Sequence, residues 1–185
     1  MSSLRIHRDL GGRSRGQAMA EFALVAPLLF ILLIGIFEAG RFVLNLETLN
    51  NATREGARYA IVHGAQSSCP TGPMPPAQTK TCKEPGRTVE AADGDHVKEA
   101  VASAAVGLAS LGKLTVHTPV WIEALSTTLP DGPDDDTIVA GNNYRGNYVS
   151  VFTDYTYDPI FKQIFDTDLI PSISMSAEST LVINH

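Results

Sequence analysis

Cysteine is scarce in this 185-residue chain, and the usual signatures of catalysis are missing. Only Cys69 and Cys82 are present, and two cysteines cannot complete a four-ligand zinc site unaided. None of the histidines stands in an H-E-x-x-H or similar ligand spacing, and no serine or cysteine lies in a nucleophile-elbow motif. The sequence therefore predicts no catalytic residue, no metal site and no cofactor, and we expect a protein that is not an enzyme.

Basic residues are also few outside the N-terminus. The formal net charge is −6, and residues 1–16 contribute +3 to it, because their arginines are opposed only by Asp9; subtracting +3 from −6 leaves −9 for residues 17–185. A chain so acidic lacks the clustered Lys and Arg that binding to nucleic-acid phosphates requires, so we expect no nucleic-acid partner. The basic tip instead favours an N-terminus held in the cytoplasm.

Charge is absent from the run between Glu21 and Glu38, and the pattern there is helical and strongly apolar. We predict one helix over residues 17–64, kinked at Pro27 and spanning a membrane to about residue 37. Such a helix is roughly 70 Å long, whereas the bilayer core takes about 30 Å of it. Its second half must therefore project beyond the membrane.

The projecting half is amphipathic and must face protein. Apolar and small side chains recur there at helical spacing, and the positions are Phe42, Leu46, Leu49, Thr53, Gly56 and Ala60. Small residues at Ala52, Gly56, Ala57 and Ala60 would let another element approach closely. We interpret this stripe as ordinary core.

The rest of the chain, residues 65–185, reads as an extracytoplasmic α+β domain with a cysteine loop. A helix is expected over 95–111, capped by Asp93 or Asp95 and ended by Gly112. Three or four antiparallel strands are expected within 113–125, 147–159 and 172–184. The fold class is thus a long N-terminal helix packed on a small antiparallel sheet with one further helix. The strand aromatics Trp121, Tyr155 and Tyr157 are expected in the core or in cross-strand pairs.

Two loops carry residues that could form a cross-link or bind a cation. Cys69 and Cys82 flank a turn-rich segment, and outside the cytoplasm a disulfide between them is expected; two free thiols are the alternative. The acidic stretch at 131–136, within a long connection over 129–147, lacks the alternating acids and distal Glu of an EF-hand loop. We expect it to be a solvated, mobile surface loop, and calcium binding there is left open.

The N-terminal stretch RSRGQAMAEF resembles the processing site of type IV pilin-like precursors. Together with ALVAPLLFILLIGIFEAGR and NNATREGARYA it is similar to the TadE family of the tight-adherence (Flp) pilus, and the later YVSVFTDYTYDP and SMSAESTL are similar to that family's C-terminal strands. The resemblance implies that prepilin peptidase removes a leader of residues 1–16 by cutting after Gly16, with Gln17, Glu21 and Phe22 completing the site. A domain larger than that of the short major Flp pilins favours a minor pilin or pseudopilin.

The resemblance also implies partners and a location. These are other pilin and pseudopilin subunits, the assembly platform of the bacterial inner membrane, and the lipid bilayer itself. Cleavage would create an ammonium at Gln17, one helical turn from Glu21, and pairing would neutralise two charges that are each costly in a membrane. Two alternatives stay open: Glu21 lies in the headgroup zone, or the chain is an uncleaved single-pass anchor bearing a periplasmic domain.

Overall fold

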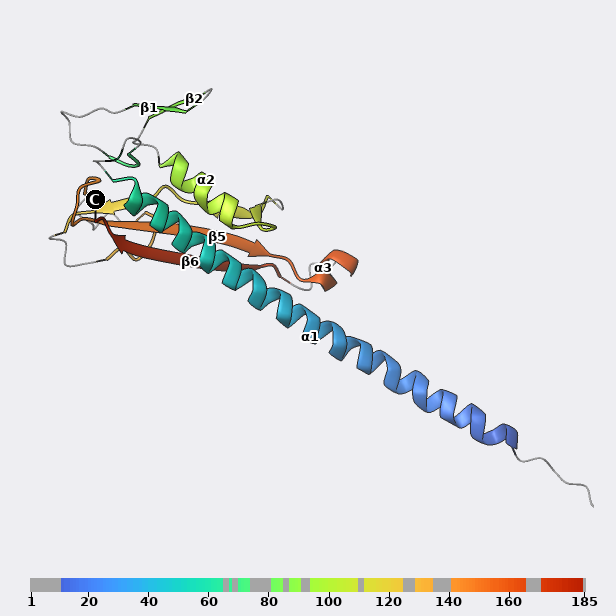
Figure 1. Cartoon of the computed structure of the whole chain (residues 1–185). Coiled ribbons are helices and arrows are strands. Elements are labelled where there is room, and N and C mark those ends of the chain that lie inside the picture. The colour runs from blue at the N-terminus through green and yellow to red at the C-terminus, as the bar shows by residue number, and fades with distance from the viewer. Residues whose placement is uncertain are drawn as a thin grey trace, which may run out of the picture. The chain divides into compact units, whose positions relative to one another are not determined.

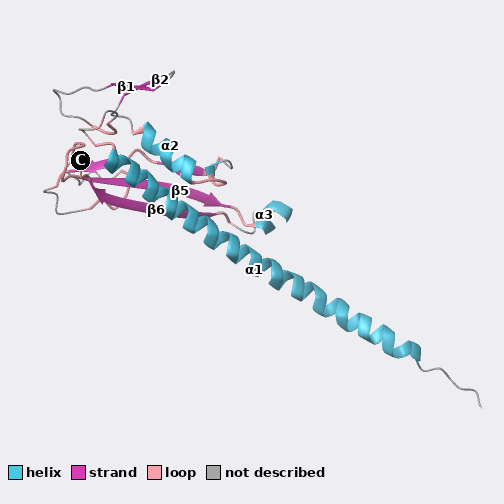
Figure 2. Cartoon of the chain, in the orientation of Figure 1, coloured by secondary structure: helices cyan, strands magenta, loops and turns pink. Residues whose placement is uncertain are grey.

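The structure is a computed structural model that describes residues 11–64, 67, 70–73, 81–84, 87–90, 94–109, 112–124, 129–134, 141–165 and 171–184. The chain divides into two compact units, Met1–Arg41 and Phe42–His185. In chain order the elements are α1 (Gly11–Val62), β1 (Thr81–Glu84), β2 (Arg87–Glu90), α2 (Asp95–Ala104), β3 (Leu114–Val116), β4 (Val120–Ile122), β5 (Tyr148–Tyr157), α3 (Ile160–Phe165) and β6 (Ile173–Val182) (Figures 1 and 2).

The long helix α1 supplies the first unit and continues into the second. It begins at Gly11, inside the segment predicted as a leader, and ends at Val62, close to the predicted end at residue 64. The helix passes through Pro27 without ending there. The predicted long helix is therefore confirmed, and the expected kink at Pro27 stays a prediction.

The second unit is built on a four-stranded antiparallel sheet with β5 at its centre. Strand β6 pairs with β5 along its whole length, from Tyr148↔Val182 to Tyr157↔Ile173. On the opposite edge of β5, β3 and β4 pair with its two ends in turn. The segment predicted as one strand at 113–125 is therefore two short strands, and Pro119, which has no backbone N–H to donate to a ladder, lies between them.

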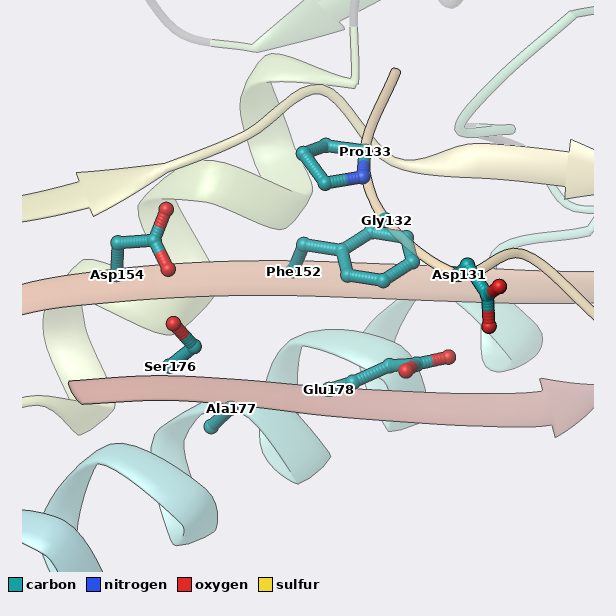
Figure 3. Close-up of a pocket in the computed structure, with 8 residues that line it drawn as sticks. All are labelled: Asp131, Gly132, Pro133, Phe152, Asp154, Ser176, Ala177 and Glu178. Carbon is teal, nitrogen blue, oxygen red and sulfur yellow. The ribbon is translucent and has the colours of Figure 1, made fainter. Parts of the chain in front are cut away.

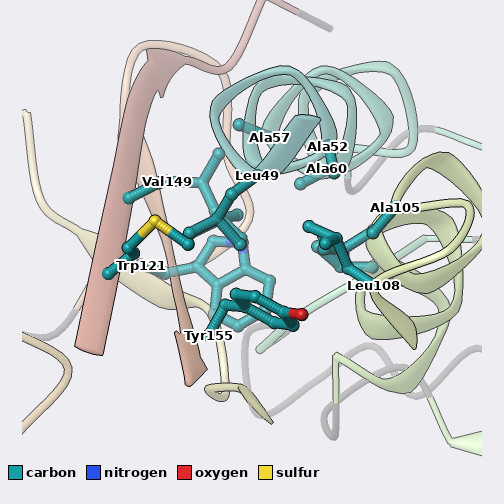
Figure 4. Packing of buried hydrophobic residues seen from close by; sticks show 14 of the residues in the cluster. Leu49, Ala52, Ala57, Ala60, Ala105, Leu108, Trp121, Val149 and Tyr155 are labelled. Atoms are coloured by element: carbon teal, nitrogen blue, oxygen red, sulfur yellow. The ribbon is translucent and has the colours of Figure 1, made fainter. Parts of the chain in front are cut away.

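Successive side chains of β5 point to opposite faces of the sheet, and one of these faces packs against the helices. Val149, Val151 and Tyr155 of β5 belong to the same buried cluster as Leu49 and Ala57 of α1. Figure 4 shows side chains from α1, the α2 region and the strands converging on this core. The predicted helical stripe is confirmed, since Leu49, Thr53, Gly56 and Ala60 are all buried. The fold class predicted from the sequence, a long helix on a small antiparallel sheet, is confirmed as well.

Helix α2 differs from its predicted bounds at both ends. Its N-cap is Gly94, which has φ 64° and makes no side-chain cap hydrogen bond, instead of an aspartate. The helix ends at Ala104, and Gly107 follows with φ 91°, a left-handed conformation that glycine adopts readily. The predicted end at residue 111 was therefore too late, because the C-cap is Ala105, whose backbone (φ −83°, ψ 47°) leaves the helical conformation.

Two features were not predicted. Strands β1 and β2 form a separate antiparallel pair, from Thr81↔Glu90 to Glu84↔Arg87, and the Pro85-Gly86 dipeptide between them is a turn signal in the sequence. The short helix α3 follows β5 directly. Within its described residues, the domain therefore holds one helix and one strand pair more than the sequence predicted.

Part of the connection predicted to be a mobile loop is tied into the domain. The Gly141 amide donates to the Trp121 carbonyl at 2.7 Å, and the Asn143 amide donates to the Pro73 carbonyl at 2.9 Å. The Asn143 side chain is fully buried and donates to the carbonyls of His63 and Thr71. This end of the connection is thus a fixed part of the domain, whereas residues 135–140 lie outside the described residues.

Candidate functional site

The predicted processing residues all lie on the exposed surface of α1. Phe22 is 72% exposed, and Gly16, Gln17 and Glu21 are exposed too. A Cβ atom added at Gly16 would meet no atom within 4 Å. The backbone at Gly16 is therefore open to an approaching partner, and its substitution would cause no clash within the described part of the chain.

Gln17 and Glu21 are already in contact in the uncut chain. The Gln17 Nε2 amide donates to Glu21 Oε1 at 3.1 Å, one helical turn away. The sequence predicted a new ammonium as the partner of Glu21, and this side-chain bond was missed, although a glutamine four residues before an acid on a helix is a recognisable pairing signal. The contact shows that the geometry brings position 17 within reach of the Glu21 carboxylate.

The apolar run that follows, residues 22–37, has no core of its own. Its large side chains are exposed, among them Phe22, Leu28, Ile31 and Phe37. The helix from Gly16 onward contains a stretch of mean hydropathy 2.5, which is long and apolar enough to cross a membrane. So many exposed apolar side chains need a lipid or protein environment. The run is compatible with membrane anchoring.

The first charged residues after this run pair with one another. Arg41 Nη1 donates to Glu38 Oε2 at 3.4 Å. Pairing one turn apart reduces the cost of placing charges next to an apolar segment. This pair marks the point at which the membrane-compatible run gives way to the half of the helix that packs on the sheet.

The predicted disulfide stays a prediction. Cys69 lies outside the described residues, and Cys82 stands in strand β1.

Among the residues that the structure describes, no group of three or more His, Cys, Asp or Glu could hold a metal ion. Asp131 and Asp134 of the acidic connection are exposed, and its remaining acids lie beyond the described part.

One ordered polar cluster lies on the sheet face away from the helices. His117 Nε2 lies 2.7 Å from Asp154 Oδ2, and Ser176 also hydrogen-bonds to this carboxylate. Burial raises the pKa of Asp154, but the hydrogen bonds from His117 and Ser176 and the charge of His117 outweigh it, so the pKa lies below its ordinary value. The carboxylate bridges the serine and the imidazole, whereas activation of a serine requires the imidazole to bridge. We therefore assign this cluster no hydrolytic role.

The strand aromatics lie where the sequence predicted them. Trp121, Tyr155 and Tyr157 are buried, and Tyr157 makes an edge-to-face contact with Phe42 of α1, with ring centroids 5.5 Å apart. They are core residues, as predicted.

Comparison with known proteins gives a match to the N-terminal part of the chain. No curated protein and no solved structure matches the chain. The family model of TadE-like proteins matches residues 16–58, which begin at Gly16 and run through the apolar and sheet-packed halves of α1. The resemblance found in the sequence is confirmed over these residues, and its extension to the C-terminal strands stays a prediction. The chain carries a TadE-like domain at residues 16–58, and this domain associates it with the Tad pilus.

Proposed function

We propose that this chain is a minor pilin or pseudopilin of a Tad-type pilus, made as a precursor and cut after Gly16 by prepilin peptidase. The observation that carries the proposal is the position of Glu21. It is the single acid at the head of an exposed, uncharged helical run, one turn from Gln17, and the TadE-like match begins at Gly16. The chain acts as a substrate and a building block, in pilus assembly, surface adhesion or secretion.

The physical role of Glu21 follows from the same geometry. Cleavage after Gly16 frees the amine of Gln17, on the residue whose side chain already reaches Glu21 at 3.1 Å. An ammonium and a carboxylate that are each costly in hydrocarbon neutralise one another when paired, within one chain or between neighbours. Because an unpaired Glu21 is penalised, the acid favours subunits that enter the assembly in the correct register.

The membrane arrangement is part of the proposal. The apolar run anchors the protein in the bacterial inner membrane, the basic leader stays on the cytoplasmic side, and residues 65–185 lie outside the cytoplasm. Prepilin peptidase, other pilin subunits, the assembly platform and the bilayer are then its partners. The second half of α1, packed against the sheet, connects the anchor to the domain.

Intact-mass analysis of the membrane-extracted protein, from strains with and without prepilin peptidase, tests the proposal. The mature chain is expected to start at Gln17 only when the peptidase is active. A Gly16→Leu variant should keep the leader, and Gly35→Leu is its matched control, because the space into which a side chain would extend is open at both glycines. A start at Met1 despite active peptidase would instead support an uncleaved single-pass anchor. A start beyond residue 38 would remove the pilin assignment altogether.

A further inference from the structure

The second unit carries two exposed arginines on the face of α1 that points away from the sheet. Arg54 and Arg58 stand one helical turn apart, while their neighbours Thr53 and Ala57 are buried against the sheet. Neither guanidinium has an ion-pair partner among the described residues. Two like charges at this spacing destabilise an isolated helix slightly, so they serve no evident purpose in the fold.

An acidic groove lies on the opposite face of the sheet. Its volume is about 480 Å³, and it lies between the 131–133 segment and strands β5 and β6 (Figure 3). The described residues that line it include three acids and no lysine or arginine, and they are Asp131, Gly132, Pro133, Phe152, Asp154, Ser176, Ala177 and Glu178.

Strand register places this groove away from α1. Thr153 of β5 hydrogen-bonds to Thr53 of α1, so its neighbours Phe152 and Asp154 project to the other side of the sheet. Glu178 is opposite Phe152 in the β5–β6 pairing, and it is exposed. The arginine pair and the groove therefore lie on opposite faces of one unit and cannot meet within one chain.

The spacing of the charges on the two surfaces is compatible. Asp154 is opposite Ser176, and the next pair on the same face is Phe152↔Glu178, so Asp154 and Glu178 are diagonal neighbours, roughly 7–8 Å apart. Residues one turn apart on a helix, such as Arg54 and Arg58, are separated by about 5–6 Å at Cβ. Arginine side chains are long enough to bridge this small difference, and a guanidinium matches the geometry of a carboxylate.

We infer that Arg54 and Arg58 of one copy dock into the acidic groove of a second copy of this chain. A contact between two different patches is heterologous, so each copy that has used its arginines still offers a groove, and the contact can propagate head to tail. A face-to-face contact of two grooves would instead oppose like charges. The inference rests on the proposed assembly role and gives it a specific surface.

The charges also explain why the occupant is a second copy. Residues 17–185 are strongly acidic in total, so an interface between copies must bring the few cations of one chain to the acids of another. Asp154 is held in place by His117 and Ser176, which fixes one wall of the groove before docking. Glu178 presents an exposed carboxylate from β6, and the Thr180 hydroxyl donates to it at 3.1 Å.

Charge reversal in the full chain, extracted from membranes in mild detergent, tests the inference. Arg58→Glu and Glu178→Arg should each reduce self-association about tenfold or more, as expected when like charges are opposed at an interface. The double variant restores the pairing with its signs exchanged and should recover association close to that of the unmodified protein. Glu123→Arg, at an exposed acid that does not line the groove, is the matched control and should change little.

A second measurement locates the contact. In an Arg58→Lys variant, a zero-length carbodiimide should couple the new amine to Glu178 or Asp154, and the linked peptides must come from two chains because the surfaces lie on opposite faces of the sheet. Absence of this linkage, or equal self-association of Glu178→Arg and the unmodified chain, would overturn the inference. The mature mass is recorded in the same samples. If the mature chain starts at Gln17 but the charge reversals leave self-association unchanged, only this interface is refuted. If the chain stays uncut, the proposed function is refuted.

Discussion

The hydroxyl oxygens of Thr53 and Thr153 lie 2.5 Å apart in the core, although the residues are a hundred positions apart in the chain. Thr53 belongs to α1 and Thr153 to the central strand β5. Thr53 also lies 2.8 Å from the Leu49 carbonyl, and Thr153 lies 3.4 Å from the Ala177 carbonyl. This chain of contacts joins the long helix, the central strand and β6 at one buried point.

Replacing Thr53 with Val should destabilise the domain. The change keeps the shape but leaves the Thr153 hydroxyl without its helix partner, and losing a partner of a buried polar group costs about 1–3 kcal/mol. Thermal unfolding of the full chain in detergent micelles, followed by the fluorescence of buried Trp121, measures this loss. Thr53→Ser, which keeps the hydroxyl, should recover most of the stability. Thr48→Val is the control, because the Thr48 hydroxyl that it removes donates to the Leu44 carbonyl of the same helix.

Gly56 should be intolerant of any side chain. A Cβ atom at this position would lie 2.2 Å from Val101 Cγ2 of α2, and valine is too stiff to move aside without cost. Gly56→Ala should therefore lower the free energy of unfolding by about 1–3 kcal/mol, the usual range for overpacking. Gly40→Ala, with open space around it, should be neutral or mildly stabilising because alanine favours helix.

A double-mutant cycle separates this clash from a general intolerance of the helix. Val101→Ala should cost stability by itself, because it leaves a cavity in the core. Gly56→Ala should cost much less in the Val101→Ala background, because the new methyl group then fills that cavity. Strictly additive effects of the two changes would show that the two positions are not in contact.

The stripe on α1 shows what the sequence could predict. Its spacing identified Leu49, Thr53, Gly56 and Ala60 as buried. The helical period of apolar and small side chains shows which face of a helix is packed, even when the element that packs against it is unknown. The same pattern could not say that α2 lies against Gly56. That contact joins residues distant in the chain, and nothing local in the sequence specifies it. The Thr53–Thr153 bond was missed for the same reason.

Other differences have local causes. The helix over 95–104 was predicted to run to residue 111 because its alanines favour helix, whereas the backbone leaves the helical conformation at the C-cap, Ala105. The composition of the acidic connection predicted a mobile loop. Near its end, however, Asn143 is buried, and it donates hydrogen bonds to the carbonyls of His63 and Pro73. At the candidate site, the order of Gly16, Gln17 and Glu21 could be read from the sequence, but the hydrogen bond that the Gln17 side-chain amide donates to Glu21 could be seen only in the structure.

Asp158 should control stability at low pH. Hydrogen bonds from Lys113 and Ser172, together with the charges of Lys113 and Lys162, hold its pKa below the ordinary value of 3.8 despite some burial. A carboxyl whose pKa is lower in the folded state stabilises the fold above its ordinary pKa, and this contribution is lost as pH falls through the folded pKa. Asp158→Asn should therefore lower stability at neutral pH.

The pH dependence of unfolding distinguishes this role from a purely structural one. As pH falls below the ordinary pKa of 3.8 and through the lower pKa of the folded state, the difference between Asp158→Asn and the unmodified chain should shrink. Urea unfolding at a series of pH values measures it, with Asp134→Asn on the exposed connection as control. A difference that stays constant between pH 7 and the acid range would contradict a role for the charged form.

The expected Cys69–Cys82 bridge can be tested directly by peptide mapping without reductant. The linked pair should be recovered from extracytoplasmic material, and quantitative alkylation of both thiols would show that they are free. By the loop-entropy argument the bridge contributes roughly 3 kcal/mol. A Cys69→Ser, Cys82→Ser variant should keep the four-stranded sheet, because the sequences of its strands β3 to β6 contain no cysteine.

Glu21 should act in assembly and not in cleavage, because its cationic partner exists only after the amine of Gln17 is freed. Glu21→Gln keeps the size of the side chain and its contact with the Gln17 amide, but removes the charge. The unpaired ammonium left behind should weaken docking of the subunit by about 1–3 kcal/mol, the range for losing a buried polar partner. The mature mass should therefore still appear in a Glu21→Gln strain, while the amount of the protein in the pilus fraction and surface adhesion both fall. Gln17→Ala, which removes the side-chain amide but leaves the new amine, is the matched variant and should retain assembly. If the mature form appears and piliation is unchanged in Glu21→Gln, the pairing explanation is wrong, and the acid at the head of the apolar run is merely tolerated near the lipid headgroups.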